Sequence, residues 1–284
     1  MQTSGSKNKD SGKSSEYQFK ILRFDPGQNA APCYKIYYLA CERGMTVLDA
    51  LMRIRETQDP TLSYRKSCRM GICGSCAMFV NGKPVLACQT QLSELTSRQV
   101  EVKPLPNFPI LRDLVPDLRS LFRHHENVKP YIIREDTREP DHASREFMQT
   151  PRELESYLQF AYCIKCGACL AACPTCATDE NFTGPQALAA AYRYVADSRD
   201  SGINERLENI DGPNGIWRCH FAGSCSEACP KGVDPSLGIQ LLKKEIWKSR
   251  LSAGQKVPAP LALVQAGAAR RKDIPSAPPP NVGK

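Results

Sequence analysis

The spacing of the cysteines constrains this chain more than any other feature of its sequence. Most of its 14 cysteines fall into three groups with short, regular spacing. Disulfide frameworks of this density are typical of small secreted domains. This chain has 284 residues, and its segment 1–16, MQTSGSKNKDSGKSSE, contains no apolar stretch of the kind that a secretory signal needs. Closely spaced cysteines in such a chain predict metal sites in a reducing compartment.

The first group has the spacing C-x4-C-x2-C with a further cysteine downstream, and comprises Cys68, Cys73, Cys76 and Cys88. This spacing matches plant-type 2Fe–2S ferredoxins, and thiolates are the soft donors that suit an iron–sulfide core. Gly71 and Gly74 allow the loop to wrap tightly, so we expect backbone N–H groups to point at the sulfurs. The alternative is a zinc site, with the C-x2-C pair as one half of it.

The other two groups form an internal repeat of the pattern C-x2-C-x2-C-x3-C-P, in which the second copy has Ala222 in place of one cysteine. In two-cluster ferredoxins of this pattern, the fourth cysteine of each run binds the cluster of the other run. The rule predicts one 4Fe–4S site with four thiolates: Cys163, Cys166, Cys169 and Cys229. It also predicts a site with three thiolates, hence a 3Fe–4S cluster: Cys173, Cys219 and Cys225.

Three cysteines lie outside these ligand sets. Cys176 follows Cys173 by three positions. It is either a buried thiol outside the ligand positions of the repeat, which we favour, or a fourth ligand that makes the third cluster 4Fe–4S. Cys33 and Cys41 flank an apolar segment and are predicted to be packing residues.

The four histidines divide into one candidate and three residues without a predicted role. His220 directly follows a ligand of the third cluster, so it either contacts that cluster or its redox partner, or lies on the surface. The others have no ligand spacing and are expected on a solvated face: His124, His125 and His142. The net charge of +8 comes from basic residues interspersed with acidic ones, without a Lys/Arg block, so we expect no nucleic-acid partner.

The N-terminal part has the pattern of a small mixed domain. Segments 17–24 and 33–39 are predicted strands, and Thr46 is predicted to cap an amphipathic helix. Asn81 and Gly82 predict a hairpin turn between two further strands, and a last strand is expected at 100–103. This order favours a β-grasp-like fold.

The part after a cluster of prolines at 104–116 is predicted to be helical. Apolar residues at 111–122 have helical spacing, Thr150 starts a capping box, and 184–198 and the segment after Asp234 are predicted helices. The predicted fold class is α+β, a β-grasp 2Fe–2S ferredoxin-like domain followed by an all-α two-cluster ferredoxin-like domain. The predicted parts are a disordered tail at 1–16, the two domains at 17–114 and 115–252, and a Pro/Ala-rich tail at 253–284. No apolar run approaches the roughly 18–20 residues that span a bilayer.

Five segments resemble the iron–sulfur subunit of succinate dehydrogenase and fumarate reductase: 67–90, 110–118, 163–174, 184–200 and 215–235. The resemblance implies an electron-transfer subunit, peripheral on the cytoplasmic face of the inner (plasma) membrane. Its implied partners are a flavoprotein with FAD, which interconverts succinate and fumarate, and membrane anchor subunits, with or without haem, that handle quinone. The 2Fe–2S cluster would face the flavin and the third cluster the quinone, near His220.

One stretch departs from part of that family. Ubiquinone-reducing members have a tryptophan pair after the first Cys-Pro, whereas this chain has Thr175, Cys176 and Ala177. Trp217 and the segment 225–227 resemble the fumarate reductase branch. The chain has no P-loop, G-x-G-x-x-G or catalytic triad, so no catalytic residue is expected on it. Two alternatives remain, namely a soluble electron adaptor for another dehydrogenase and a zinc-stabilised interaction protein.

Overall fold

The computed structural model describes residues 15–28, 31–135 and 146–251, and divides the chain into two units, Met1–Asp117 and Leu118–Lys284. The predicted tail at 253–284, most of the predicted tail at 1–16, and His142 lie outside the described residues. Residues 15 and 16 belong to the first strand. The sequence placed the domain boundary after residue 114.

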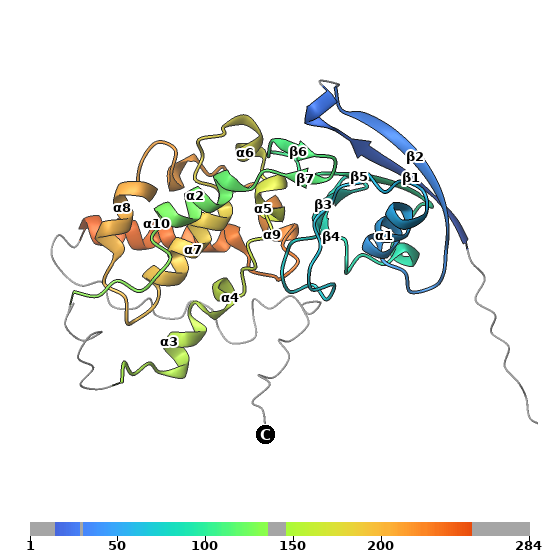
Figure 1. Ribbon diagram of the computed structural model, residues 1–284. Helices are drawn as coiled ribbons and strands as arrows, with labels where there is room; N and C mark the ends of the chain where they lie inside the picture. Colours follow the sequence, from blue (N-terminus) through green and yellow to red (C-terminus); the bar gives the residue numbers. More distant parts are fainter. Residues whose placement is uncertain (1–14, 29–30, 136–145, 252–284) are drawn as a thin grey trace, which may run out of the picture. The chain divides into compact units, whose positions relative to one another are not determined.

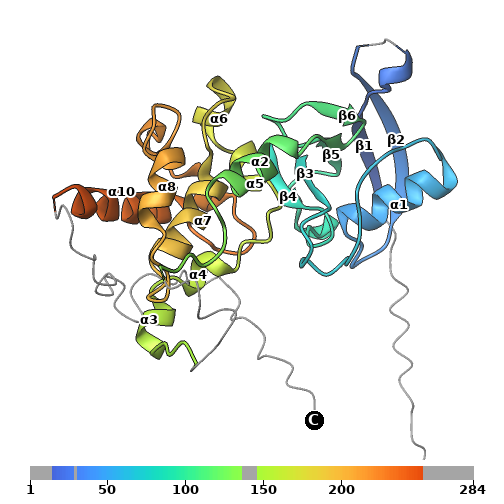
Figure 2. The same cartoon turned by 60° about the vertical axis from the view of Figure 1, so that its left-hand side comes forward.

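The first unit contains a five-stranded sheet with the strand order β2-β1-β5-β3-β4 (Figures 1 and 2). Strands β1 (Ser15–Arg23) and β2 (Cys33–Cys41) pair antiparallel, and β1 pairs parallel with β5 (Gln99–Lys103). Strands β3 (Ala77–Val80) and β4 (Lys83–Leu86) form a hairpin. A 3-10 turn at Pro26–Gln28 lies between β1 and β2, and helix α1 (Val47–Thr57) follows β2. This is the predicted β-grasp arrangement.

Local sequence signals account for the turns of this unit. Thr46 and Asp49 form a reciprocal capping box at the start of α1, which satisfies backbone donors that the helix itself leaves unpaired. The apolar face of α1 is completely buried: Val47, Ala50, Leu51 and Ile54. Asn81 and Gly82 have φ angles of 45° and 81°, which are the left-handed conformations that a two-residue hairpin requires.

The helical spacing at 111–122 gave a wrong prediction for its first half. The structure has two short antiparallel strands, β6 (Ile110–Arg112) and β7 (Val115–Pro116), joined by a turn at Asp113 with φ of 43°. The buried Asp113 carboxylate accepts hydrogen bonds from the backbone N–H groups of Phe24, at 2.9 Å, and Ser63, at 2.8 Å. These non-local bonds hold the turn, so the helix begins only at Arg119.

The second unit is helical, and its described residues include no strand. Its helices are α2 (Arg119–Asn127), α3 (Pro151–Glu155), α4 (Leu158–Ala161), α5 (Ala168–Ala171), α6 (Pro174–Thr178), α7 (Pro185–Val195), α8 (Ile203–Ile210), α9 (Ser224–Glu227) and α10 (Pro235–Leu251). Two further 3-10 turns lie at Leu92–Glu94 in the first unit and at Ile216–Arg218 in the second. No described helix is long and apolar enough to span a bilayer.

Helices α7 and α10 pack side by side at the centre of this unit (Figures 1 and 2). The close approach depends on small residues, since a Cβ atom added at Gly238 would lie 2.8 Å from the Phe160 ring. Phe160 in turn packs edge-on against Tyr192, with ring centroids 5.0 Å apart. The core of this unit combines small residues of α7, such as Ala187 and Ala191, with larger apolar residues of α10, such as Ile239 and Leu242.

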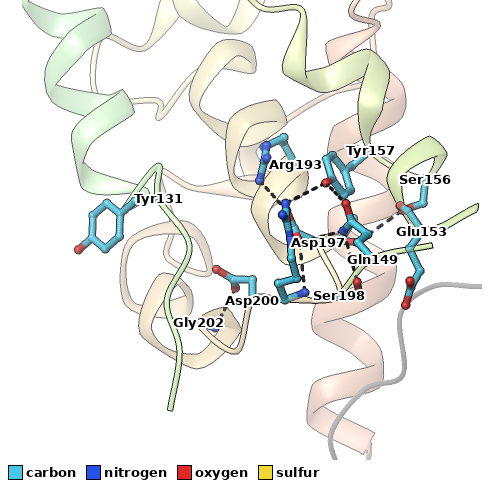
Figure 3. A network of polar contacts seen from close by, with 12 residues as sticks. Tyr131, Gln149, Glu153, Ser156, Tyr157, Arg193, Asp197, Ser198, Asp200 and Gly202 are labelled. Atoms are coloured by element: carbon cyan, nitrogen blue, oxygen red, sulfur yellow. Dashed lines mark hydrogen bonds and ion pairs between the residues drawn. The ribbon is translucent and has the colours of Figure 1, made fainter. Parts of the chain in front are cut away.

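A buried carboxylate holds the end of α7 to the segment before α4 (Figure 3). Asp197 accepts from Arg199 Nε at 2.8 Å and from Arg193 Nη1 at 3.1 Å. Arg199 also donates to the Tyr157 hydroxyl, which donates to Gln149 Oε1 at 2.7 Å. Burial opposes ionisation of Asp197, but the hydrogen bonds from Arg199 outweigh it and lower the pKa of that carboxyl. The charge is therefore paired where it is buried.

Candidate metal centres

The first cysteine group lies on a tight loop of the first unit. Cys68 Sγ accepts hydrogen bonds from the backbone N–H groups of Ile72 and Cys73, both at 3.3 Å, and Cys88 Sγ accepts from Gly71 at 3.2 Å. Gly71 and Gly74 have φ angles of 72° and 73°. The loop therefore directs its amides at sulfur, as predicted from its glycines. Such N–H···S bonds stabilise added negative charge on a thiolate-bound cluster.

The thiols of this loop differ in their acidity. Hydrogen bonds from Ser75 and from the backbone lower the pKa of Cys73 to about 6, whereas burial raises the pKa of Cys76 to about 12. A buried thiol is costly to ionise by itself, but it becomes a thiolate when it coordinates a metal cation, which stabilises the negative charge. This donor set therefore fits a resident metal cluster.

The second unit contains a cavity lined by cysteines from both copies of the repeat. Its cysteines are those predicted for the 4Fe–4S site: Cys163, Cys166, Cys169 and Cys229. Lys165 and Lys231 also line it, and their positive charge suits a group with several thiolate ligands. Burial raises the pKa of Cys166 to about 11 and also raises the pKa of Cys169, so both thiols need a nearby cation in order to ionise. Sequence-distant Cys229 thus joins the first run.

Another cavity collects the remaining ligands predicted from the repeat. It is lined by Cys173, Cys219 and Cys225. Ala222 and His220 also line it, and both are exposed at the surface. Cys173 comes from the first copy of the repeat, so each copy contributes its last cysteine to the cavity of the other. In both cavities the thiols line the wall. The described residues contain no group of three or more His, Cys, Asp or Glu side chains placed to hold a metal ion.

Both copies of the repeat fold into the same turn. Lys165 and Phe221 have φ angles of 54° and 58°, and the following Gly167 and Gly223 have 85° and 78°. Helices α5 and α9 begin directly after these glycines. Ala222 therefore occupies the backbone position that a cysteine has in the first copy.

The cysteines outside the ligand sets have different environments. Cys176 is half-buried beside Cys173, and it does not line either cavity of the second unit. A hydrogen bond between the two lowers the pKa of Cys173 to about 6 and raises that of Cys176. Cys41 is buried, as predicted. Cys33 is exposed, so its prediction as a packing residue was wrong: it is the first residue of β2, which is an edge strand of the sheet.

Two histidines of α2 were misjudged from the sequence. His124 and His125 are half-buried, and burial lowers the pKa of both. Gln186, which the sequence analysis missed, lines the cavity predicted for the 4Fe–4S cluster and lies within 3.1 Å of His125 and 3.8 Å of Cys163. A lone amide in the otherwise apolar run P-Q-A-L-A-A-A was the available signal.

Family comparisons agree with this division of the chain. Residues 18–123 match the family model of a 2Fe-2S iron-sulfur cluster binding domain. Residues 159–233 match that of a 4Fe-4S dicluster domain. The two matches cover the cysteine loop of the first unit and both copies of the repeat in the second.

Whole-chain relatives are equally consistent. The fumarate reductase iron-sulfur subunit of Haemophilus influenzae is 45% identical over 81% of this chain and 92% of its own length. The succinate dehydrogenase iron-sulfur subunit of Paracoccus denitrificans is 38% identical over 83% and 90%. A chain of the Mycobacterium smegmatis Sdh1 complex in the apo form superimposes with a TM-score of 0.70 and 25% identity, covering 85% of this chain and all of that one. The chain belongs to the family of iron–sulfur subunits of fumarate reductase and succinate dehydrogenase.

Proposed function

We propose that the chain carries three clusters in a relay, with a separate set of cysteines for each. The 2Fe–2S cluster is held by the loop cysteines of the first unit: Cys68, Cys73, Cys76 and Cys88. The 4Fe–4S cluster takes Cys163, Cys166, Cys169 and Cys229. A 3Fe–4S cluster takes Cys173, Cys219 and Cys225. When bound, the clusters accept and release single electrons, and the cysteine thiolates hold them in place.

The observation that carries this proposal is the exchange of one cysteine between the two halves of the repeat. Cys229 lines the cavity of the first run and Cys173 that of the second. Two independent zinc ribbons would each keep their own cysteines together. An exchanged ligand is the pattern of two-cluster ferredoxins.

Membership of the family implies that the chain works with a flavoprotein and a membrane anchor. We infer that the flavoprotein carries FAD and the succinate/fumarate site, and that quinone, with or without haem, is handled by the anchor on the cytoplasmic face of the plasma membrane. The surface at the cavity lined by Cys173, Cys219 and Cys225 supports its assignment to the quinone side. His220 and Phe221 line the cavity and are exposed there. Trp217 stacks edge-on with Trp247 on the same unit, at 6.1 Å.

A redox titration of the purified complex, followed by electron paramagnetic resonance, tests the relay. The expected result is three distinct signals, one of them from a 3Fe–4S cluster in the oxidised sample. A third signal that appears only on reduction, with four irons in that cluster, would mean that a fourth ligand completes the site, with Cys176 as the candidate, and that the repeat rule fails there.

The exchanged ligands predict opposite effects for two matched substitutions. Cys229→Ser should weaken or abolish the 4Fe–4S signal and leave the 3Fe–4S signal unchanged, because the serine replaces a proposed ligand of the 4Fe–4S cluster. Cys173→Ser should do the reverse. Both are measured by spin quantification in the assembled complex. If each substitution instead damages the cluster of its own run, the exchanged assignment is wrong.

The cysteine loop of the first unit gives a further matched pair. Gly71→Ala strains a left-handed residue whose N–H donates to Cys88 Sγ, and its Cβ atom would lie 2.2 Å from the exposed amide end of Gln89, which has to move away. Gly82→Ala has the same backbone cost, but nothing lies within 4 Å of its Cβ position. We expect Gly71→Ala to lose most of the 2Fe–2S absorbance and Gly82→Ala to retain it. Equal losses would show that backbone strain alone matters.

A further inference from the structure

A buried amide lies against the wall of the 4Fe–4S cavity. Gln186 is in the first turn of α7 and only 3% exposed. Its Nε2 atom is 3.8 Å from Cys163 Sγ and 3.1 Å from His125 Nδ1. One nitrogen thus reaches both the proposed cluster ligand and a half-buried histidine on α2, all within the second unit.

The chemistry of the two neighbours determines how this amide is oriented. A cysteine thiolate accepts hydrogen bonds and cannot donate one, so the atom facing it has to be the amide nitrogen. Both amide protons are then used, one toward Cys163 and one toward His125, whose Nδ1 accepts. Burial, together with the charge of Lys165, lowers the pKa of His125 to about 4. The ring is therefore neutral near pH 7, with Nδ1 available as an acceptor.

The other end of the amide shows that this orientation has a cost. Gln186 Oε1 is buried and has no hydrogen-bond partner among the described residues. A buried polar atom without a partner destabilises the fold, and an apolar side chain at this position would avoid that penalty. The hydrogen bond from Nε2 to Cys163 Sγ is the interaction that compensates for this cost.

We propose that Gln186 raises the reduction potential of the 4Fe–4S cluster by donating a hydrogen bond to Cys163, and that His125 is the positioning residue that keeps the amide nitrogen turned toward the sulfur. The inference rests on the proposed assignment of Cys163 as a ligand. Reduction adds one negative charge to the cluster and its thiolates. An N–H dipole aimed at a ligand sulfur stabilises the reduced form more than the oxidised form, and the effect is strengthened where water is excluded.

The test is a redox titration of the assembled complex with Gln186→Leu, followed by paramagnetic resonance. Losing one charge-assisted hydrogen bond should lower the ratio of reduced to oxidised 4Fe–4S cluster on the order of tenfold at a given potential, which equals a shift of about 59 mV for one electron. The potentials of the other two clusters should not move. Gln186→Met, an unbranched side chain of similar length, should give the same shift if Gln186→Leu assembles poorly.

A second substitution tests the role of the histidine. His125→Ala should lower the 4Fe–4S potential in the otherwise native chain but add nothing when Gln186 is already leucine, because it acts only through that amide. Additive shifts would overturn the positioning role. An unchanged 4Fe–4S potential in both Gln186 variants would overturn the hydrogen bond, as would equal shifts in all three clusters. A 4Fe–4S signal that survives Cys163→Ser, with Gln186 and His125 unchanged, would instead refute the ligand assignment on which the inference rests.

Discussion

Replacing Ala222 with cysteine is expected to convert the third cluster from three irons to four. Ala222 lines the cavity together with the three proposed ligands of that cluster. It occupies the turn position that a cysteine has in the first copy of the repeat, after Phe221 and before Gly223 with matching φ angles. A thiol placed there needs no change of backbone, and a fourth thiolate completes the donor set of a cubane cluster.

The conversion has clear signatures. The signal of the oxidised 3Fe–4S cluster should disappear, a signal of a reduced 4Fe–4S cluster should appear, and iron analysis should find one additional iron per chain. Electron transfer to quinone should fall strongly, because cluster type is a main determinant of reduction potential. Succinate-dependent reduction of the 2Fe–2S cluster should be retained, since neither the flavin side nor the first unit is altered.

Ala222→Ser is the matched control for this experiment. It has nearly the size of cysteine but presents a hydroxyl, a harder donor than the thiolates around it. We expect Ala222→Ser to keep the three-iron cluster. If the serine variant also gains a fourth iron, or if the wild type already has four, then a ligand other than residue 222 completes the site, and Cys176→Ala identifies whether it is Cys176.

Replacing Arg206 with methionine is expected to destabilise the second unit by about 3–5 kcal/mol, the usual effect of breaking a buried ion pair from one side. The side chains of Arg206 and Asp200 are 0% and 1% exposed. Arg206 Nη1 donates to Asp200 Oδ1 at 2.6 Å, and Nη2 donates to the Tyr131 carbonyl at 2.6 Å. Its Nε donates to the Val128 carbonyl at 3.2 Å. Methionine would leave a buried carboxylate without its positive partner and would remove the Arg206 donors from buried backbone carbonyls.

Denaturation of the variant, followed by circular dichroism, measures this loss. Arg53→Met is a suitable control, because its ion pair with Glu42 is 3.5 Å long and exposed at both ends, and we expect a change of less than about 1 kcal/mol. Adding Asp200→Asn to Arg206→Met should recover part of the loss, since asparagine removes the unpaired charge. Its single oxygen still accepts from one of the two backbone N–H groups that the carboxylate binds, Ile133 or Gly202; Figure 3 shows Asp200 with Gly202. A loss in Arg206→Met as small as in the control would contradict the buried-pair argument.

Local signals in the sequence predicted local structure well. The Asn81-Gly82 hairpin, both capping boxes and the tight glycines of the cysteine loop depend on residues within a few positions of each other. The prediction failed where distant residues decide. At 111–122 the helical spacing was real, but Asp113 is held in a turn by backbone donors of Phe24 and Ser63, roughly fifty to ninety positions away.

The metal centres show the same division. By itself, the sequence identified the family and predicted the three ligand sets and the missing ligand at Ala222, because cluster ligands are held by short loops whose spacing is visible in one dimension. Only the tertiary structure decided what surrounds the cysteines: that Gln186 reaches Cys163, that His125 is half-buried against it, and that Cys33 is exposed. These depend on how α2 packs on α7 and on which strand lies at the edge of the sheet, and such contacts between distant segments leave no spacing pattern to read.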